Sequence, residues 1–118
     1  MLNVVVYPKC STCRSAIKWF EANEIPFKKR HIVEEKLSAA ELREIHVKSD
    51  LPIKKFFNTN GMKYRELGLK DKIDAMTDDA CYERLAADGM LVKRPLVYSE
   101  AGTVTLGFKV GEYEKAWQ

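Results

Sequence analysis

The segment Cys10-Ser11-Thr12-Cys13-Arg14 constrains this chain most, because it stands at the junction between two different hydrophobic patterns. Before it, residues 2–7 form a short, nearly continuous apolar run, typical of a strand buried on both faces, and Pro8 ends the run. After it, apolar residues recur at helical spacing on one face, at Cys13, Ala16, Ile17 and Phe20. The sequence therefore predicts a strand at residues 2–7 and a helix at about 11–23, with two cysteines at the start of the helix.

A cysteine in this position has unusual chemistry. The unpaired backbone N–H groups and the dipole at a helix N-terminus favour the thiolate, and a following cation such as Arg14 adds to the effect. We expect the N–H groups of Ser11, Thr12 and Cys13 to face the sulfur of Cys10. Cys13 lies one turn further along, deeper in the apolar face. Cys10 is therefore predicted to be the exposed nucleophile, and Cys13 the resolving thiol that closes a Cys10–Cys13 disulfide.

Two other interpretations of the cysteine pair remain. A C-x-x-C segment can form half of a zinc site, but no second cysteine pair exists and neither His31 nor His46 stands at finger spacing. Both cysteines can also be inert core residues, since free cysteines are often buried. Cys81, at helical spacing from Leu85, is predicted to be such a core residue. We expect no metal and no cofactor.

The rest of the chain predicts a β-α-β unit, a helical middle and a β-β-α unit. A charged strand at 26–32 is expected near a sheet edge. Ser38-Ala39-Ala40-Glu41 matches a capping box for a helix at 38–48, and Thr77 begins another helix that Gly89 ends. Further helical turns are expected around 52–57 and within 63–76. Strands at 96–98 and 103–108 and a helix at 111–117 complete a mixed sheet with helices on its faces.

Composition narrows the classes of function. Lys and Arg (20 together) alternate with Asp and Glu (17), so the net charge of +3 forms no basic block and nucleic-acid binding is not expected. No stretch approaches the roughly 20 apolar residues of a membrane helix. Asn3 and Lys9 interrupt the first apolar run, which argues against a secretory signal. We expect a cytoplasmic, monomeric protein that does not bind membranes.

Lys93-Arg94-Pro95 is the second segment that can carry chemistry. Proline is allowed at the entry to a strand, and X-Pro is the bond at which a cis peptide costs little. From the residues alone, Arg94 is a solvated surface charge unless it reaches Cys10, where its guanidinium stabilises the thiolate or holds an oxyanion. The same two interpretations apply to Lys109, which follows the last expected strand.

Four segments together resemble the ArsC/Spx family, in the family's order and across nearly the whole chain: Tyr7 to Arg14, Tyr64 to Leu69, Arg94 to Val97 and Gly107 to Lys109. The resemblance implies an α/β, thioredoxin-like fold, with a mixed four-stranded sheet, flanking helices and a helical insertion. Residues 1–118 would form one domain, with 1–33 and 90–118 as the thioredoxin-like part and 34–89 as the insertion. It also implies a cis peptide before Pro95, close to the active cysteine.

The family's arsenate reductases suggest roles for individual residues. The resemblance implies that Cys10 and Arg94 are catalytic together with Cys13, and that the substrate contacts Ser11, Thr12, Arg14, Pro95, Lys109 and Asn58. The implied substrate is an oxyanion, arsenate, and the implied reductant is a glutathione/glutaredoxin or thioredoxin system. Asn58 and Lys109 stand where the family has arginines, and neither offers a bidentate guanidinium. We therefore predict a thiol-disulfide oxidoreductase in which arsenate reduction is weak.

The regulators of the family offer the alternative. Spx/MgsR-type proteins share the C-x-x-C and the Arg-Pro, and they bind the RNA polymerase α subunit with the cysteine pair as a redox switch. Their characteristic Gly-Thr-Asp segment is not found in the helical middle, where this chain reads Lys48-Ser49-Asp50-Leu51-Pro52-Ile53. The resemblance therefore implies a regulator less strongly than a reductase.

Overall fold

The computed structural model describes residues 1–118, and the chain divides into two compact units. The first unit combines Met1–His31 with Arg94–Gln118, and the second is Ile32–Lys93. The first unit therefore brings the two ends of the sequence together, and with them the Cys10 segment and the Arg94-Pro95 segment.

The first unit is built on a four-stranded sheet in the order β2-β1-β3-β4. Its strands are β1 (Leu2–Val6), β2 (Phe27–His31), β3 (Leu96–Tyr98) and β4 (Val104–Leu106). β1 runs parallel to β2 and antiparallel to β3, and β3 pairs antiparallel with β4. This arrangement confirms the mixed four-stranded sheet, and it places the charged strand β2 at an edge, as its sequence predicts.

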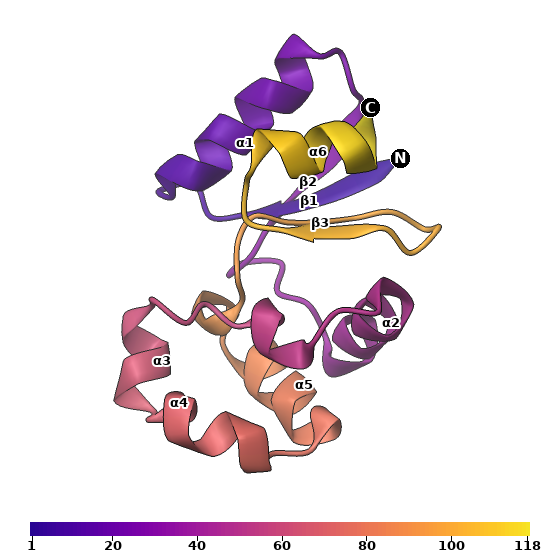
Figure 1. The fold of residues 1–118 in the computed structure, drawn as a ribbon. Helices are drawn as coiled ribbons and strands as arrows, with labels where there is room; N and C mark the ends of the chain where they lie inside the picture. The colour runs from indigo at the N-terminus through magenta and orange to yellow at the C-terminus, as the bar shows by residue number, and fades with distance from the viewer. The chain divides into compact units, whose positions relative to one another are not determined.

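Two helices cover one face of this sheet, as Figure 1 shows: α1 (Ser11–Ala22) and α6 (Val110–Trp117). Between them and the sheet lies a core formed by Val4, Val6, Cys13, Ala16, Phe20, Val97 and Tyr113. Val5, which alternates with Val4 and Val6 along β1, is also fully buried. The central strand is thus buried on both faces, as its continuous apolar run indicates.

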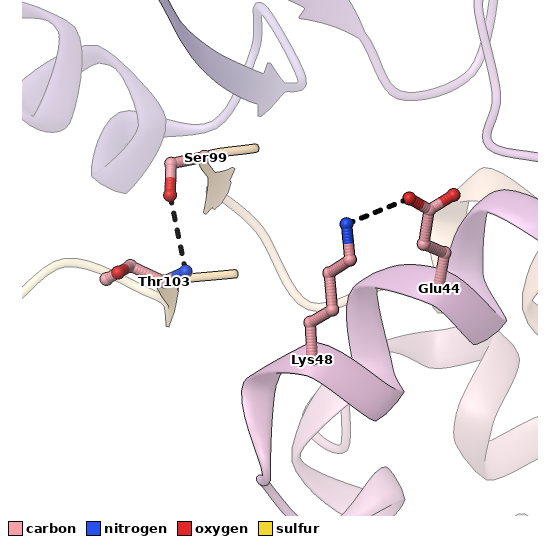
Figure 2. A network of polar contacts seen from close by, with 4 residues as sticks. All are labelled: Glu44, Lys48, Ser99 and Thr103. Carbon is pink, nitrogen blue, oxygen red and sulfur yellow. Dashed lines mark hydrogen bonds and ion pairs between the residues drawn. The ribbon is translucent and has the colours of Figure 1, made fainter. Parts of the chain in front are cut away.

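The strands β3 and β4 are joined by a tight turn. Ser99 N–H donates to the carbonyl of Thr103 (3.0 Å), and Thr103 N–H donates back to the hydroxyl of Ser99 (3.2 Å; Figure 2). Gly102 completes the turn with a φ of 100°, a conformation that other residues rarely adopt. β4 itself covers only three of the six residues that alternate in sequence, so the strand is shorter than predicted.

The second unit is helical. It contains α2 (Ala39–Ser49), α3 (Met62–Glu66), α4 (Leu69–Lys72) and α5 (Asp78–Ala87), with 3₁₀ turns at Ile53–Phe56, Ile73–Ala75 and Gly89–Leu91. The capping box of α2 is complete, because Ser38 Oγ accepts from Glu41 N–H and Glu41 Oε1 accepts from Ser38 N–H. One turn apart on the exposed side of α2, Glu44 and Lys48 form an ion pair at 3.0 Å (Figure 2).

The prediction that Gly89 ends α5 was wrong. The helix ends at Ala87, Asp88 is extended, and Gly89 begins the following 3₁₀ turn. Glycine is required there by close packing rather than by helix termination, because a Cβ on Gly89 would lie 2.2 Å from the carbonyl oxygen of Ile32. No helix of the chain is both long enough and apolar enough to cross a membrane.

Candidate active site

Cys10 lies at the turn between β1 and α1, where it is the N-cap residue of the helix. Its backbone is extended (φ −89°, ψ 118°), and its N–H donates to the carbonyl of Tyr7 at 3.0 Å. Its sulfur accepts the N–H of Cys13 at 3.4 Å and so takes the place that a hydroxyl or carboxylate has in most caps. The side chain is half-buried. The sulfur is therefore both ordered by the helix and open to a reactant.

Several neighbours act on the acidity of Cys10. Partial burial opposes ionisation, but hydrogen bonds from the backbone and side chain of Cys13, with a hydrogen bond and the positive charge of Arg94, outweigh it. The net effect is to lower the pKa of Cys10 below its ordinary value. A larger fraction of this thiol is therefore thiolate at neutral pH than in a free cysteine.

Cys13 has the opposite character. Its side chain is 1% exposed and belongs to the core under α1. Burial, followed by the hydrogen bond with Cys10 and the charge of Cys10, raises the pKa of Cys13 to about 12. A backbone hydrogen bond from Tyr7 and the charge of Arg94 act in the other direction and do not compensate. Cys13 is a protonated thiol that donates to the sulfur of Cys10.

Arg94 reaches this site from the other end of the sequence. The peptide bond between Arg94 and Pro95 is cis, as the resemblance implies, and Pro95 is buried at the start of β3. The guanidinium carbon lies 5.2 Å from the centre of the Tyr7 ring, within range of a cation–π contact. Two of its nitrogens, Nε and Nη1, are buried without a hydrogen-bond partner. Because unpaired buried donors are costly, these N–H groups are suited to donate hydrogen bonds to a ligand oxygen or another acceptor atom.

The other predicted site residues lie on different elements of the chain. Ser11, Thr12 and Arg14 are exposed on the first turn of α1, close in sequence to Cys10. Lys109 is exposed at the start of α6. Asn58 belongs to the second unit, where its backbone is held by Leu91 and Gly61. The first unit brings together Cys10, Cys13 and Arg94, and the roles predicted for all nine residues stay predictions.

The sequence missed Tyr7. We expected this residue to end the first strand and to begin the Tyr7–Arg14 segment, without a role in the site, whereas its ring lies against Arg94 and its backbone contacts both cysteines. An aromatic residue at the exit of a buried strand is common, so no local pattern signals the contact. Nor did the adjacent cations supply the charge that acts on Cys10, since Arg14 is exposed and Arg94 has that effect.

The mixed sheet β2-β1-β3-β4, with a half-buried and a buried cysteine on the first turn of the helix that follows β1, defines a protein of the thioredoxin-like class. Residues 6–116 match the ArsC family. The chain belongs to that family.

No group of three or more His, Cys, Asp or Glu side chains is arranged to hold a metal ion.

Relatives and solved structures agree with this assignment. The chain is 50% identical to the uncharacterized protein YusI of Bacillus subtilis over 94% of this chain and 93% of YusI. The structure matches a Bacteroides fragilis protein described as related to the ArsC family (44% identity, 98% and 96% of the two chains, TM-score 0.92). It also matches a possible arsenate reductase from Streptococcus mutans UA159 (40% identity, 93% and 92%, TM-score 0.87).

More distant relatives include regulators. The global transcriptional regulator Spx of Listeria innocua is 27% identical over 85% of this chain and 75% of Spx.

Proposed function

We propose that this chain is a thiol-disulfide oxidoreductase in which Cys10 is the nucleophile, Cys13 the resolving thiol and Arg94 the group that stabilises negative charge. One observation carries the proposal: two sulfurs one helical turn apart have pKa values displaced in opposite directions, Cys10 downward and Cys13 upward. A reactive thiolate beside a protonated thiol in its own hydrogen bond is the starting state that such a reaction needs.

In the first step, the Cys10 thiolate attacks one sulfur of a substrate disulfide. A bond forms between Cys10 and that sulfur, the substrate S–S bond breaks, and the other sulfur leaves as a thiolate that takes up a proton. The exposed edge of Cys10 admits the substrate, and the guanidinium of Arg94 offsets the negative charge that passes between the three sulfurs.

In the second step, Cys13 loses its proton and attacks Cys10, which forms the Cys10–Cys13 disulfide and releases the remaining substrate thiolate. The charge of Cys10 and the hydrogen bond with it help to raise the pKa of Cys13. A mixed disulfide on Cys10 removes both of these contributions, so Cys13 becomes easier to ionise once it is needed. Two electrons from an external dithiol or from glutathione then restore the pair.

The direct test compares disulfide reduction and arsenate reduction by one preparation, with either a thioredoxin or a glutathione/glutaredoxin system as reductant. We expect disulfide turnover to exceed arsenate turnover, since Asn58 and Lys109 replace the arginines implied for an oxyanion site. Cys10→Ser is expected to be inactive. Cys13→Ser is expected to accumulate a mixed disulfide on Cys10 that mass spectrometry detects.

Cys81→Ala provides the matched control, because Cys81 is a fully buried thiol of the second unit whose pKa is raised by burial. It is expected to retain turnover. Full turnover by Cys13→Ser would exclude the intramolecular disulfide and favour a monothiol route through glutathione.

The similarity to Spx supports a second candidate, a redox-responsive regulator that binds the RNA polymerase α subunit. The same thiol pair would then act as a switch instead of turning over. Pull-down of polymerase with reduced and with oxidised protein separates the two candidates. Recovery in one redox state without disulfide turnover would support the regulator, and turnover without recovery would support the enzyme.

A further inference from the structure

We propose that Tyr7 is the positioning residue of this site, holding the two cysteines through its backbone and the Arg94 guanidinium through its ring. The inference rests on the proposed function for its chemistry and on three separate contacts of Tyr7 for its geometry.

The backbone of Tyr7 contacts both sulfur-bearing residues. Its carbonyl accepts the N–H of Cys10 at 3.0 Å, which closes the turn that leads from β1 into α1. A hydrogen bond from its own backbone reaches Cys13 and acts to lower the pKa of that thiol. The backbone of Tyr7, directly after β1, therefore fixes the start of α1 at Cys10 and at Cys13.

The ring of Tyr7 supplies the contact to Arg94. The distance of 5.2 Å from the guanidinium carbon to the ring centre is that of a cation above an aromatic ring. Because Nε and Nη1 of Arg94 have no hydrogen-bond partner, hydrogen bonds do not hold those two nitrogens in place. The ring face therefore orients the guanidinium together with its hydrogen bond to Cys10, while Nε and Nη1 stay available to a reactant.

The Tyr7 ring is itself held in orientation. The His31 ring packs edge to face against it, with the centres 6.0 Å apart and the planes at 85°. His31 ends β2, the strand that pairs with β1, so the orientation of the Tyr7 ring is set by the sheet. His31 therefore fixes the orientation of the Tyr7 ring, and the Tyr7 ring in turn fixes the position of the Arg94 guanidinium.

The test measures the pH at which Cys10 becomes reactive towards an alkylating agent, which needs no turnover. Tyr7→Leu keeps the backbone hydrogen bonds and removes the ring. We expect it to move the midpoint of the alkylation profile upward by about 0.5 to 1 pH unit, a 3- to 10-fold lower thiolate fraction below the midpoint. Tyr7→Phe retains the ring face and is expected to restore the wild-type midpoint.

A double-mutant cycle distinguishes a role of Tyr7 in positioning the Arg94 guanidinium from a general role in supporting the fold. In the Arg94→Ala background the ring has no guanidinium to hold, so Tyr7→Leu is expected to produce no further shift. An undiminished shift in that background, or no shift in the wild-type background, would overturn the proposal.

A second variant without the ring and an NMR measurement on the wild type extend the test. Should Tyr7→Leu fail to fold, Tyr7→Gln also lacks a ring and suits a half-exposed position. In the wild-type protein, the ring current of Tyr7 is expected to shift the side-chain proton signals of Arg94 upfield in NMR spectra, and unshifted signals would contradict the contact. A wild type that shows these effects but reduces no disulfide would refute the proposed function and leave the role of Tyr7 intact.

Discussion

Cys10 and Cys13 share one turn of helix, yet they differ because one sulfur caps the turn and the other enters the core. Capping gives Cys10 a backbone donor, and burial deprives Cys13 of the water that would stabilise its charge. The asymmetry of the pair is therefore a property of strand-to-helix geometry, to which Arg94 adds a charge.

The contribution of Arg94 to the acidity of Cys10 can be measured by substitution. Arg94→Ala removes a hydrogen bond and a positive charge, so we expect the pKa of Cys10 to rise and its alkylation at neutral pH to slow by about tenfold, the effect of one pKa unit. Arg94→Lys keeps the charge and is expected to fall between the two. An unchanged alkylation profile in Arg94→Ala would contradict the role assigned to this guanidinium.

Stability should depend on pH through the same two thiols. The pKa of Cys10 is lower in the folded protein than its ordinary value of 9.0, so the unfolded state binds more protons in the interval between them. The stabilisation from Cys10 is complete above pH 9.0 and is lost as the pH falls through the folded pKa. Cys13 acts in reverse: with its pKa raised to about 12, its contribution is present below pH 9.0 and is lost between there and about pH 12.

The measurement is urea denaturation of reduced wild type and Cys10→Ser across the range from neutral pH to pH 9.0. The difference in unfolding free energy in favour of the wild type is expected to grow as the pH rises. A difference that is independent of pH would mean that Cys10 has the same pKa in both states.

Some residue roles follow from sequence because their causes are local. A cysteine between a buried strand and an amphipathic helix predicts a capped, accessible sulfur, and helical spacing predicts that Cys13 turns inward. The contact of Arg94 with Tyr7 has no local signal, because chain topology alone brings β1 and β3 together. The resemblance to the family, not the spacing, indicated that Arg94 approaches the cysteine.

At the scale of elements, glycine positions show which packing contacts are tight. Gly89→Ala would place a Cβ 2.2 Å from the backbone oxygen of Ile32. This oxygen can move only if the backbone around Ile32 moves with it. We expect a loss of about 2–3 kcal/mol in the free energy of unfolding, typical of overpacking. Gly111→Ala is the control: nothing lies within 4 Å of its added Cβ, and alanine should stabilise α6 by about 0.5–1 kcal/mol.

The urea midpoint of each variant measures these changes, provided that the slope of the transition stays constant. Equal stability of Gly89→Ala and wild type would show that the backbone around Ile32 yields to the new methyl group.

Element boundaries were predictable where side chains cap the backbone. The Ser38–Glu41 box and the Thr77 cap begin their helices where the sequence places them. The end of α5 was not predictable, because the glycine that resembles a helix stop serves a contact with a residue far away in sequence. The short helices α3 and α4 were also poorly resolved in sequence, since each has few residues on which a period can be read.

For the whole molecule, we predict a monomer. The large apolar side chains that are exposed, Met1, Val33, Val47, Met62 and Val110, are spread over separate segments of the chain. Large contiguous apolar patches on a surface mark sites of protein–protein association. Analytical ultracentrifugation is expected to give the chain mass of 13.6 kDa, and a concentration-dependent increase towards twice that mass would contradict the prediction.

The order of strands and helices was readable from the sequence as β-α-β, a helical middle and β-β-α, and the mixed sheet follows from it. The two compact units were not delimited by a linker in the sequence, because the chain passes between them without a glycine- or serine-rich stretch. That residues 1–118 behave as one domain, with 34–89 as an insertion, stays a prediction.

The capping role of Cys10 has a consequence for the motion of α1. A sulfur bonded to a second sulfur is a poorer acceptor than a thiolate, so the proposed mixed disulfide on Cys10 would weaken the hydrogen bond from the amide of Cys13. The first turn of the helix should therefore fray when Cys10 is occupied and tighten again when it is freed. Fraying of that turn would let the Cys13 thiol move towards the Cys10 sulfur. Formation of the mixed disulfide would thereby favour the second step of the proposed reaction.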